Sequence, residues 1–197
     1  MSLKVAKPKT QRGKRFLQNR NAKNEENVKS AMLIRGGKTS ELITQAMKDI
    51  YVLKKPHAAI FQRKNILRPF EDQSSLEFFS QKSDASLMLF GSHSKKRPNN
   101  LVFGCFYDGH ILDMIELGVE KYIPMSNFKA KKVTSGTKPC VMFSGEEFDS
   151  KLEYQRARTL LTDFWRGGKP TNIRLQGLEH VIQITAANEN IFFRSYR

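Results

Sequence analysis

The sequence is poor in the residues that mark secreted, membrane-spanning or metal-binding proteins. Its two cysteines, Cys105 and Cys140, lie in separate apolar runs, where thiols usually act as small core residues of a reducing compartment. Its four histidines are isolated and lack the short spacing of zinc ligands. No run approaches the roughly 20 apolar residues of a membrane span, and the N-terminal stretch lacks the apolar segment of a secretory signal. We therefore expect a soluble, intracellular protein with no metal, no cofactor and no membrane partner.

Acidic residues are also scarce. The chain has 19 Asp and Glu against 34 Lys and Arg, which gives a formal net charge of +15 and a pI near 9.9. Such an excess of positive charge attracts polyanions, of which nucleic acid is the intracellular candidate. The 39% of hydrophobic residues suffices for a folded core. A length of 197 residues favours one domain.

Part of the positive charge is concentrated at the N-terminus. Residues 1–28 have almost no apolar periodicity, and they contain many cations and only two acidic residues, Glu25 and Glu26. This composition predicts a basic arm that stays disordered until it meets a polyanion, followed by a globular domain over 29–197. The arm supplies four candidate RNA contacts: Lys9, Arg12, Lys14 and Arg15.

Residues 31–118 predict an alternation of strands and helices. The apolar run at 31–34 indicates a strand, and the helical spacing of apolar residues from Leu42 to Ile50 indicates a helix, capped by Thr39 or Ser40 and closed by Pro56. A strand is expected at 57–63, and a helix that begins with a capping box of Ser74 and Glu77. The runs 86–92 and 101–107 predict strands buried on both faces. A short helix is expected at 110–117, with Asp108 as its cap.

The remainder of the chain repeats this order. A strand at 139–143 is followed by a glycine turn and by an amphipathic helix, for which Ser150 and Glu153 form a second capping box and Gly167 with Gly168 the end. Residues 139–166 thus repeat the pattern of residues 31–53. The final segments, 178–186 and 190–197, predict a hairpin. The fold class we expect is α/β, with mixed sheets covered by helices and two pseudo-equivalent halves.

Two patterns suggest enzymatic chemistry, and both are incomplete. The sequence Gly37-Lys38-Thr39 resembles the end of a phosphate-binding loop, but that motif requires a further glycine at the position of Met32. Cys105, Asp108 and His110 are close in sequence, but nothing in the spacing gives them hydrogen-bond geometry. We therefore expect no catalytic residues. The RGGKTS turn keeps a smaller role, because Arg35, Lys38 and the amides of a helix N-terminus suit one RNA phosphate.

The basic loop at 92–100 is more informative. Three consecutive cations, Lys95, Lys96 and Arg97, stand between two predicted buried strands, and the amides of Asn99 and Asn100 follow them. A loop mounted in this way offers a set of phosphate contacts. A second basic loop contains Lys131 and Lys132. The alternative for each loop is that its cations are exposed to solvent and bind no RNA.

Long motifs in unbroken order carry a family resemblance. The stretch from Arg68 to Gly104, then YDGHILDMIELGVEKY, LLTDFWRG, NIRLQGLEHVI and FRSYR, resembles the Brix-domain family of ribosome-assembly factors. The resemblance implies two halves similar to anticodon-binding domains of aminoacyl-tRNA synthetases, no catalysis, and a nucleolar role in maturation of the large ribosomal subunit. In one branch it implies a heterodimer with a small ribosome-synthesis regulator, which recruits 5S rRNA with its ribosomal proteins into pre-ribosomes.

Two departures from the family pattern limit what the resemblance implies. Cys105 stands where we expect an arginine, so an RNA contact at that position is either absent or supplied by a neighbouring residue. The family also continues beyond FRSYR, so we expect a Brix domain truncated at its C-terminal end. A second hypothesis remains open, in which the chain is a protein-only scaffold of the pre-ribosome without direct RNA contact.

Overall fold

The computed structural model describes residues 8–20, 27–129, 133–168 and 178–197, which form two sheets and the helices between and around them. The first sheet has the order β2-β1-β3-β4-β5 and the second β6-β7-β8. The first sheet consists of β1 (Ala31–Gly36), β2 (Ala58–Asn65), β3 (Leu87–Ser92), β4 (Asn100–Tyr107) and β5 (His110–Gly118). The second consists of β6 (Cys140–Ser144), β7 (Val181–Ala187) and β8 (Asn190–Tyr196). The described helices are α1 (Gln11–Arg20), α2 (Glu41–Lys54), α3 (Ser74–Ser83), η1 (Met125–Asn127), α4 (Glu147–Ser150) and α5 (Leu152–Trp165).

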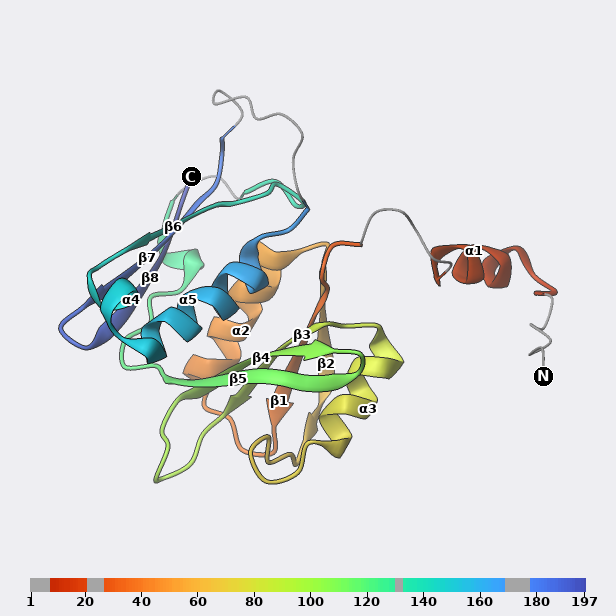
Figure 1. Cartoon of the computed structure of the whole chain (residues 1–197), viewed down its shortest axis with the longest axis horizontal. Coiled ribbons are helices and arrows are strands. Elements are labelled where there is room, and N and C mark those ends of the chain that lie inside the picture. The colour runs from red at the N-terminus through yellow and green to blue at the C-terminus, as the bar shows by residue number, and fades with distance from the viewer. Residues whose placement is uncertain (1–7, 21–26, 130–132, 169–177) are drawn as a thin grey trace.

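The two sheets share a layer of helices. Figure 1 shows α2 and α5 between the first and second sheets, with α3 on the opposite face of the first sheet. The strand–helix order of 31–53, formed by β1 and α2, recurs at 139–166 in β6, α4 and α5. In each half the first strand pairs in parallel with a later strand, which pairs antiparallel with the next. The predicted mixed α/β fold of two related halves is confirmed.

The helix α2 forms where the local sequence signals predict it. The Ser40 side chain accepts a hydrogen bond from the Ile43 amide at 3.3 Å, and Lys55 ends the helix before Pro56. Its buried apolar residues, Ile43, Ala46 and Met47, belong to the predicted stripe against the first sheet. Gly91 lies under this helix, where a Cβ atom would stand 2.4 Å from the Met47 sulfur, so only glycine lets α2 pack this closely on β3.

The predicted helix at 110–117 is wrong, because these residues form the strand β5. Asp108 and Gly109 both have positive φ, 51° and 79°, and make the tight hairpin turn between β4 and β5. An Asp-Gly pair between apolar runs is a strong hairpin signal, and it outweighs an apolar spacing that fits a helix as well as a strand. Asp108 is therefore a turn residue and no helix cap.

Both predicted capping boxes are also wrong. The Ser74 hydroxyl donates to the Asp72 carboxylate at 2.7 Å, and Glu77 accepts the Ile111 amide of β5 at 3.2 Å. The bonds from Ser74 hold the pKa of Asp72 below its usual range. Ser150 lies in α4, and Lys151 precedes α5 without a side-chain cap. Glu77 matches the spacing of a capping box, but its contact with β5 decides its partner.

The N-terminal arm differs from expectation as well. Residues 11–20 form the helix α1, whereas the sequence predicted no ordered structure before a partner binds. Arginine, lysine and glutamine, which are frequent in this segment, have good helix propensity. The hairpin of β7 and β8 is confirmed, with Asn188 and Glu189 at positive φ in its turn.

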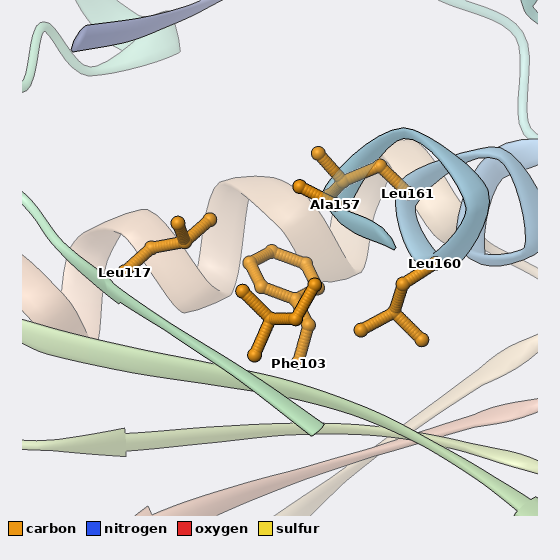
Figure 2. A pocket seen from close by; sticks show the side chains of 6 residues that line it. Phe103, Leu117, Ala157, Leu160 and Leu161 are labelled. Atoms are coloured by element: carbon orange, nitrogen blue, oxygen red, sulfur yellow. The ribbon is translucent and has the colours of Figure 1, made fainter. Parts of the chain in front are cut away.

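Each half contributes to one shared core. Figure 2 shows Ala157, Leu160 and Leu161 of α5 facing Phe103 of β4 and Leu117 of β5. The gap between these side chains is too small for a water-sized molecule. Phe103 meets Phe164 of α5 edge to face, with ring centroids 5.2 Å apart. Since α5 belongs to the second half and β4 to the first, the two halves fold around the same apolar interior.

The described residues contain no helix that is long and apolar enough to cross a membrane. Among them there is also no group of three or more metal-ligating side chains. Cys105 is buried with its thiol against the Asp113 carbonyl at 3.8 Å, while His110 contacts Glu77, so Cys105, Asp108 and His110 do not form a catalytic arrangement. Burial raises the pKa of the Cys105 thiol. Cys140 is half-buried.

A buried lysine joins the two helices of the shared layer. Lys54, at the end of α2, is 7% exposed, and its ammonium donates to the Phe164 carbonyl near the end of α5. The same group lies over the Phe164 ring, 5.3 Å from the centroid. Burial lowers the pKa of Lys54 from 10.5 to about 8, against the opposing effect of Asp163.

This pKa predicts a pH-dependent stability. Between pH 8 and 10.5 the unfolded chain keeps a proton on Lys54 that the folded chain has released, so the free energy of unfolding rises with pH in that window. We expect Lys54 to contribute a rise of about 1–3 kcal/mol, which Lys54→Met removes. The measurement is denaturant unfolding of both proteins from pH 7 to 9.5.

The comparison of wild type with Lys54→Met isolates the contribution of Lys54 to the pH dependence. Cys105 and Tyr122, whose pKa values are raised, titrate in both proteins and cancel in the difference between them. The matched control is Lys55→Met, which removes an exposed lysine at the next position and leaves Lys54 in place. Equal profiles for wild type and Lys54→Met would contradict the prediction.

Candidate nucleic-acid interface

Among the described residues, the predicted phosphate contacts of the globular domain meet at one edge of the first sheet. The strands β2, β1 and β3 are parallel neighbours, so their carboxyl ends lie at the same edge. From β1 the chain runs through α2 to β2 on one side, whereas from β3 it runs to β4 on the other side. Open α/β sheets bind ligands at such a change of direction, outside the carboxyl ends of the strands. The turn after β1 and the loop after β3 are the two segments that the sequence marked as candidate phosphate contacts.

A tight turn presents the cations of the loop after β3. The Ser94 amide donates to the Arg97 carbonyl at 3.0 Å, and the Arg97 amide donates to the Ser94 hydroxyl at 3.1 Å. Lys95 and Lys96 occupy the tip of this turn, and both are exposed. Arg97 pairs with Glu116 of β5 at 2.9 Å, although its side chain remains 62% exposed. The two lysines are therefore the more available phosphate contacts.

The two asparagines of the loop serve its structure. Asn99 has φ 46°, its side chain accepts a hydrogen bond from the Ser40 hydroxyl at 2.7 Å, and its amide donates to His93 at 3.1 Å. Asn100 is buried, and its side chain donates to Glu116. These bonds tie the loop to the first turn of α2 and to β5. The side-chain oxygen of Asn99 and the side-chain nitrogen of Asn100 are thus occupied within the chain.

The turn after β1 lies directly beside this loop. The His93 amide donates to the Lys38 carbonyl at 2.9 Å, so the turn and the loop are joined through their backbones. The Lys38 side chain is exposed. Arg35 is half-buried at the irregular pairing of β1 and β2, where it donates to the Gln62 carbonyl. Lys38 can therefore reach a ligand, whereas Arg35 mainly holds the strand ends together.

Two further cations belong to this edge and were missed in the sequence. Arg63 and Lys64 lie at the end of β2, both are exposed, and Lys64 is the register partner of Arg35. No local motif marks them, because their position becomes meaningful only once β2 is known to be parallel to β1. We call the set Arg35, Lys38, Arg63, Lys64, Lys95, Lys96 and Arg97 the basic edge.

The basic edge has a strong excess of positive charge. Its seven cations are accompanied by two carboxylates from the same strand ends and helix start, Glu41 and Glu116. Glu116 is already paired with Arg97. The N-terminus of α2 opens at the same place, and its partial positive charge adds to the field. The chemistry suits an extended chain of phosphates.

The other predicted contacts lie elsewhere. Lys9 precedes α1, and Arg12, Lys14 and Arg15 lie on it; all four are exposed. Lys131 and Lys132 lie outside the described residues.

The fold and this edge define an α/β protein of two related halves that carries a cationic surface at the carboxyl ends of parallel strands. Residues 36–197 match the model of the Brix domain. The chain therefore belongs to the Brix domain family.

Curated relatives agree with this assignment. The chain is 55% identical over 194 residues to a ribosome production factor 2 homolog of Bos taurus, covering 98% of this chain and 63% of the relative. It is 41% identical over 196 residues to the homolog of Drosophila melanogaster, covering 99% and 61%. The chain thus spans about three fifths of the length of these relatives.

A solved structure shows the same fold. The crystal structure of a probable ribosomal biogenesis protein from Aeropyrum pernix K1 matches with a TM-score of 0.56 over 85% of this chain and 89% of that chain. At 12% sequence identity the likeness concerns the fold alone.

Asn99 offers a test of how the loop is held. We expect Asn99→Ala to lower the free energy of unfolding by about 1–3 kcal/mol, because it removes the bond to Ser40 and replaces Asn, which tolerates positive φ, by Ala, which tolerates it less well. Asn99→Gly removes the same bond without the backbone strain, and should cost about 1 kcal/mol less than Asn99→Ala. Thermal or denaturant unfolding measures both. Equal losses would show that the backbone conformation contributes nothing.

Proposed function

We propose that this chain is a non-catalytic ribosome-assembly factor that binds ribosomal RNA through the basic edge and a protein partner through another surface. The observation that carries the proposal is the gathering of seven cations from three parallel strand ends around one loop. The names of the relatives, ribosome production factor 2 homologs, place those proteins in ribosome production. A role of this chain in ribosome biogenesis follows from membership of the same family.

The finer assignment is also a proposal. The chain acts in maturation of the large subunit, in the nucleolus, and helps recruit 5S rRNA with its ribosomal proteins into pre-ribosomes. Its protein partner is a small ribosome-synthesis regulator, with which it forms a heterodimer. Supporting this, the net charge of +15 suits the phosphate-rich interior of an assembling ribosome. No nucleotide hydrolysis is expected, because Met32 lies buried in β1 where a phosphate-binding loop needs glycine.

One prediction of the proposed function concerns the loop after β3. Replacing Lys95, Lys96 and Arg97 together by Ala should weaken RNA binding to a similar extent for unrelated RNA sequences. If each available cation neutralises about one phosphate, the slope of log affinity against log salt should flatten by roughly 2 to 3 units, nearer 2 because Glu116 already pairs with Arg97. Fluorescence anisotropy with labelled RNA at several salt concentrations measures the slope.

A matched control tests whether the effect depends on where the three cations lie or only on the charge that is removed. Lys48, Lys82 and Lys151 are exposed lysines outside the basic edge, and their triple replacement by Ala removes the same formal charge. This control should leave the slope nearly unchanged. An unchanged slope in the first variant would mean that the loop faces protein or solvent, as in the scaffold hypothesis.

Another prediction of the proposed function concerns the protein partner. The strand β8 lies at the edge of the second sheet with most of its residues exposed, whereas β4, its counterpart in the first half, is paired on both sides. Unpaired edges invite association, so the chain alone should aggregate and the partner should suppress this by adding a strand. Light scattering and hydrogen exchange of β8 amides, with and without the partner, measure this. A chain that is monomeric and cooperatively folded alone at high concentration would contradict it.

A further inference from the structure

We propose that the outer face of the second sheet, centred on β8, stacks unpaired RNA bases, which is a contact distinct from phosphate binding at the basic edge. Strand register and burial identify this face. Along β7 the buried residues are Ile182, Ile184 and Ala186, which face the helices, so the alternate residues point outward. We call the outward residues the stacking face: Cys140, Met142, Ser144, Val181, Gln183, Thr185, Phe192, Arg194 and Tyr196.

None of these nine residues is buried. The contrast with the first half is direct, because the corresponding face of the first sheet packs an apolar cluster against α3. Phe192 is 40% exposed and Tyr196 is 48% exposed, although both are large aromatic side chains. Folding of the described residues therefore leaves both rings accessible to a ligand.

The pattern along β8 fits single-stranded RNA. Phe192, Arg194 and Tyr196 alternate on one face, so neighbouring members are about 7 Å apart along the strand. The Arg194 guanidinium lies over the Phe192 ring, 5.2 Å from its centroid, which shows that a flat group fits against that ring. Sheets that present aromatic side chains in this way stack two or three bases of a single strand. Arginine adds stacking and an attraction to phosphate.

The neighbouring residues favour RNA over an apolar protein surface. Gln183 pairs with Arg194 in register, and Thr185 pairs with Phe192, so polar groups stand between the rings. Gln183 offers both a donor and an acceptor for a base edge. Arg194 is the one charged residue of the stacking face, and the chain as a whole is strongly positive. A protein interface core, in contrast, is usually a continuous apolar patch.

The test removes both rings but keeps an apolar side chain at each position. The variant Phe192→Leu with Tyr196→Leu is compared with wild type in binding to a single-stranded uridine oligomer and to an RNA hairpin stem. We expect the affinity for the single strand to fall about tenfold or more, because stacking is lost. The affinity for the paired stem and both log–log salt slopes should not change, since no phosphate contact is removed.

Controls distinguish the loss of base stacking from a general effect of removing exposed rings and from a failure to fold. Phe70→Leu with Phe78→Leu removes two exposed rings elsewhere and should leave single-strand affinity unchanged. Fluorescence of the buried Trp165 reports whether each variant folds. In wild type, an iodouridine-substituted oligomer should photocrosslink to Phe192 or Tyr196. Unchanged single-strand affinity in the β8 variant, an equal loss in the control pair, or loss of partner binding alone would overturn the proposal.

The inference rests on the proposed RNA binding, but the two fail separately. If the Lys95, Lys96 and Arg97 variant flattens the salt slope while the β8 variant binds normally, the basic edge stands and the stacking face fails. If the β8 variant loses single-strand affinity while the loop variant keeps its salt slope, the stacking face stands and the basic edge fails.

Discussion

The packing of α2 and α5 between the two sheets is the constraint on which the rest of the molecule depends. Each helix has to bury an apolar stripe, and each sheet has to cover one face, so both halves are satisfied by the same layer. The contact of Phe103 with Phe164 joins the first sheet to α5. The bond from Lys54 to the Phe164 carbonyl then joins the ends of the two helices. A charged group inside this layer is tolerated because a carbonyl and an aromatic ring receive it.

The same packing positions the candidate interface. Because Gly91 lets α2 lie close on β3, the first turn of the helix comes near the loop that follows β3. Ser40 both caps the helix and binds Asn99, so helix, turn and loop form one hydrogen-bonded unit. The charges that this unit presents are on side chains, but their relative positions are set by backbone bonds such as that from His93 to Lys38. A polar surface is thus held by an apolar layer beneath it.

Much of the fold could be predicted from the sequence where local signals and tertiary contacts agree. The stripe of α2 and the fully buried strands β3 and β4 are such cases, since their apolar patterns correspond to surfaces that the fold buries. The strand β5 was missed because its apolar residues fit two periodicities, and the decisive signal was the Asp108-Gly109 turn beside it. The capping boxes failed because Glu77 finds its partner in β5, which is distant in sequence.

The candidate site was predictable only in part, for the same reason. The cations at 95–97 form a visible run, whereas Arg63 and Lys64 gain their meaning from the parallel pairing of β2 with β1. Asn99 and Asn100 looked like ligand-binding amides, but a sequence does not reveal that Ser40 and Glu116 occupy them. Charge can be counted along a chain. Its arrangement on a surface depends on register and strand order.

The connection between the halves has a consequence for how the protein is built. After β5 the chain runs back along α2, where the Asp49 carboxylate accepts bonds from the Tyr122 hydroxyl and the Met125 amide. The connection is therefore anchored to the helix that both sheets cover. The first half has an apolar cluster of its own beneath α3, but the larger cluster around α2 and α5 draws its residues from both halves. The halves have become interdependent, so that a break at their junction would yield two incomplete fragments instead of two smaller proteins.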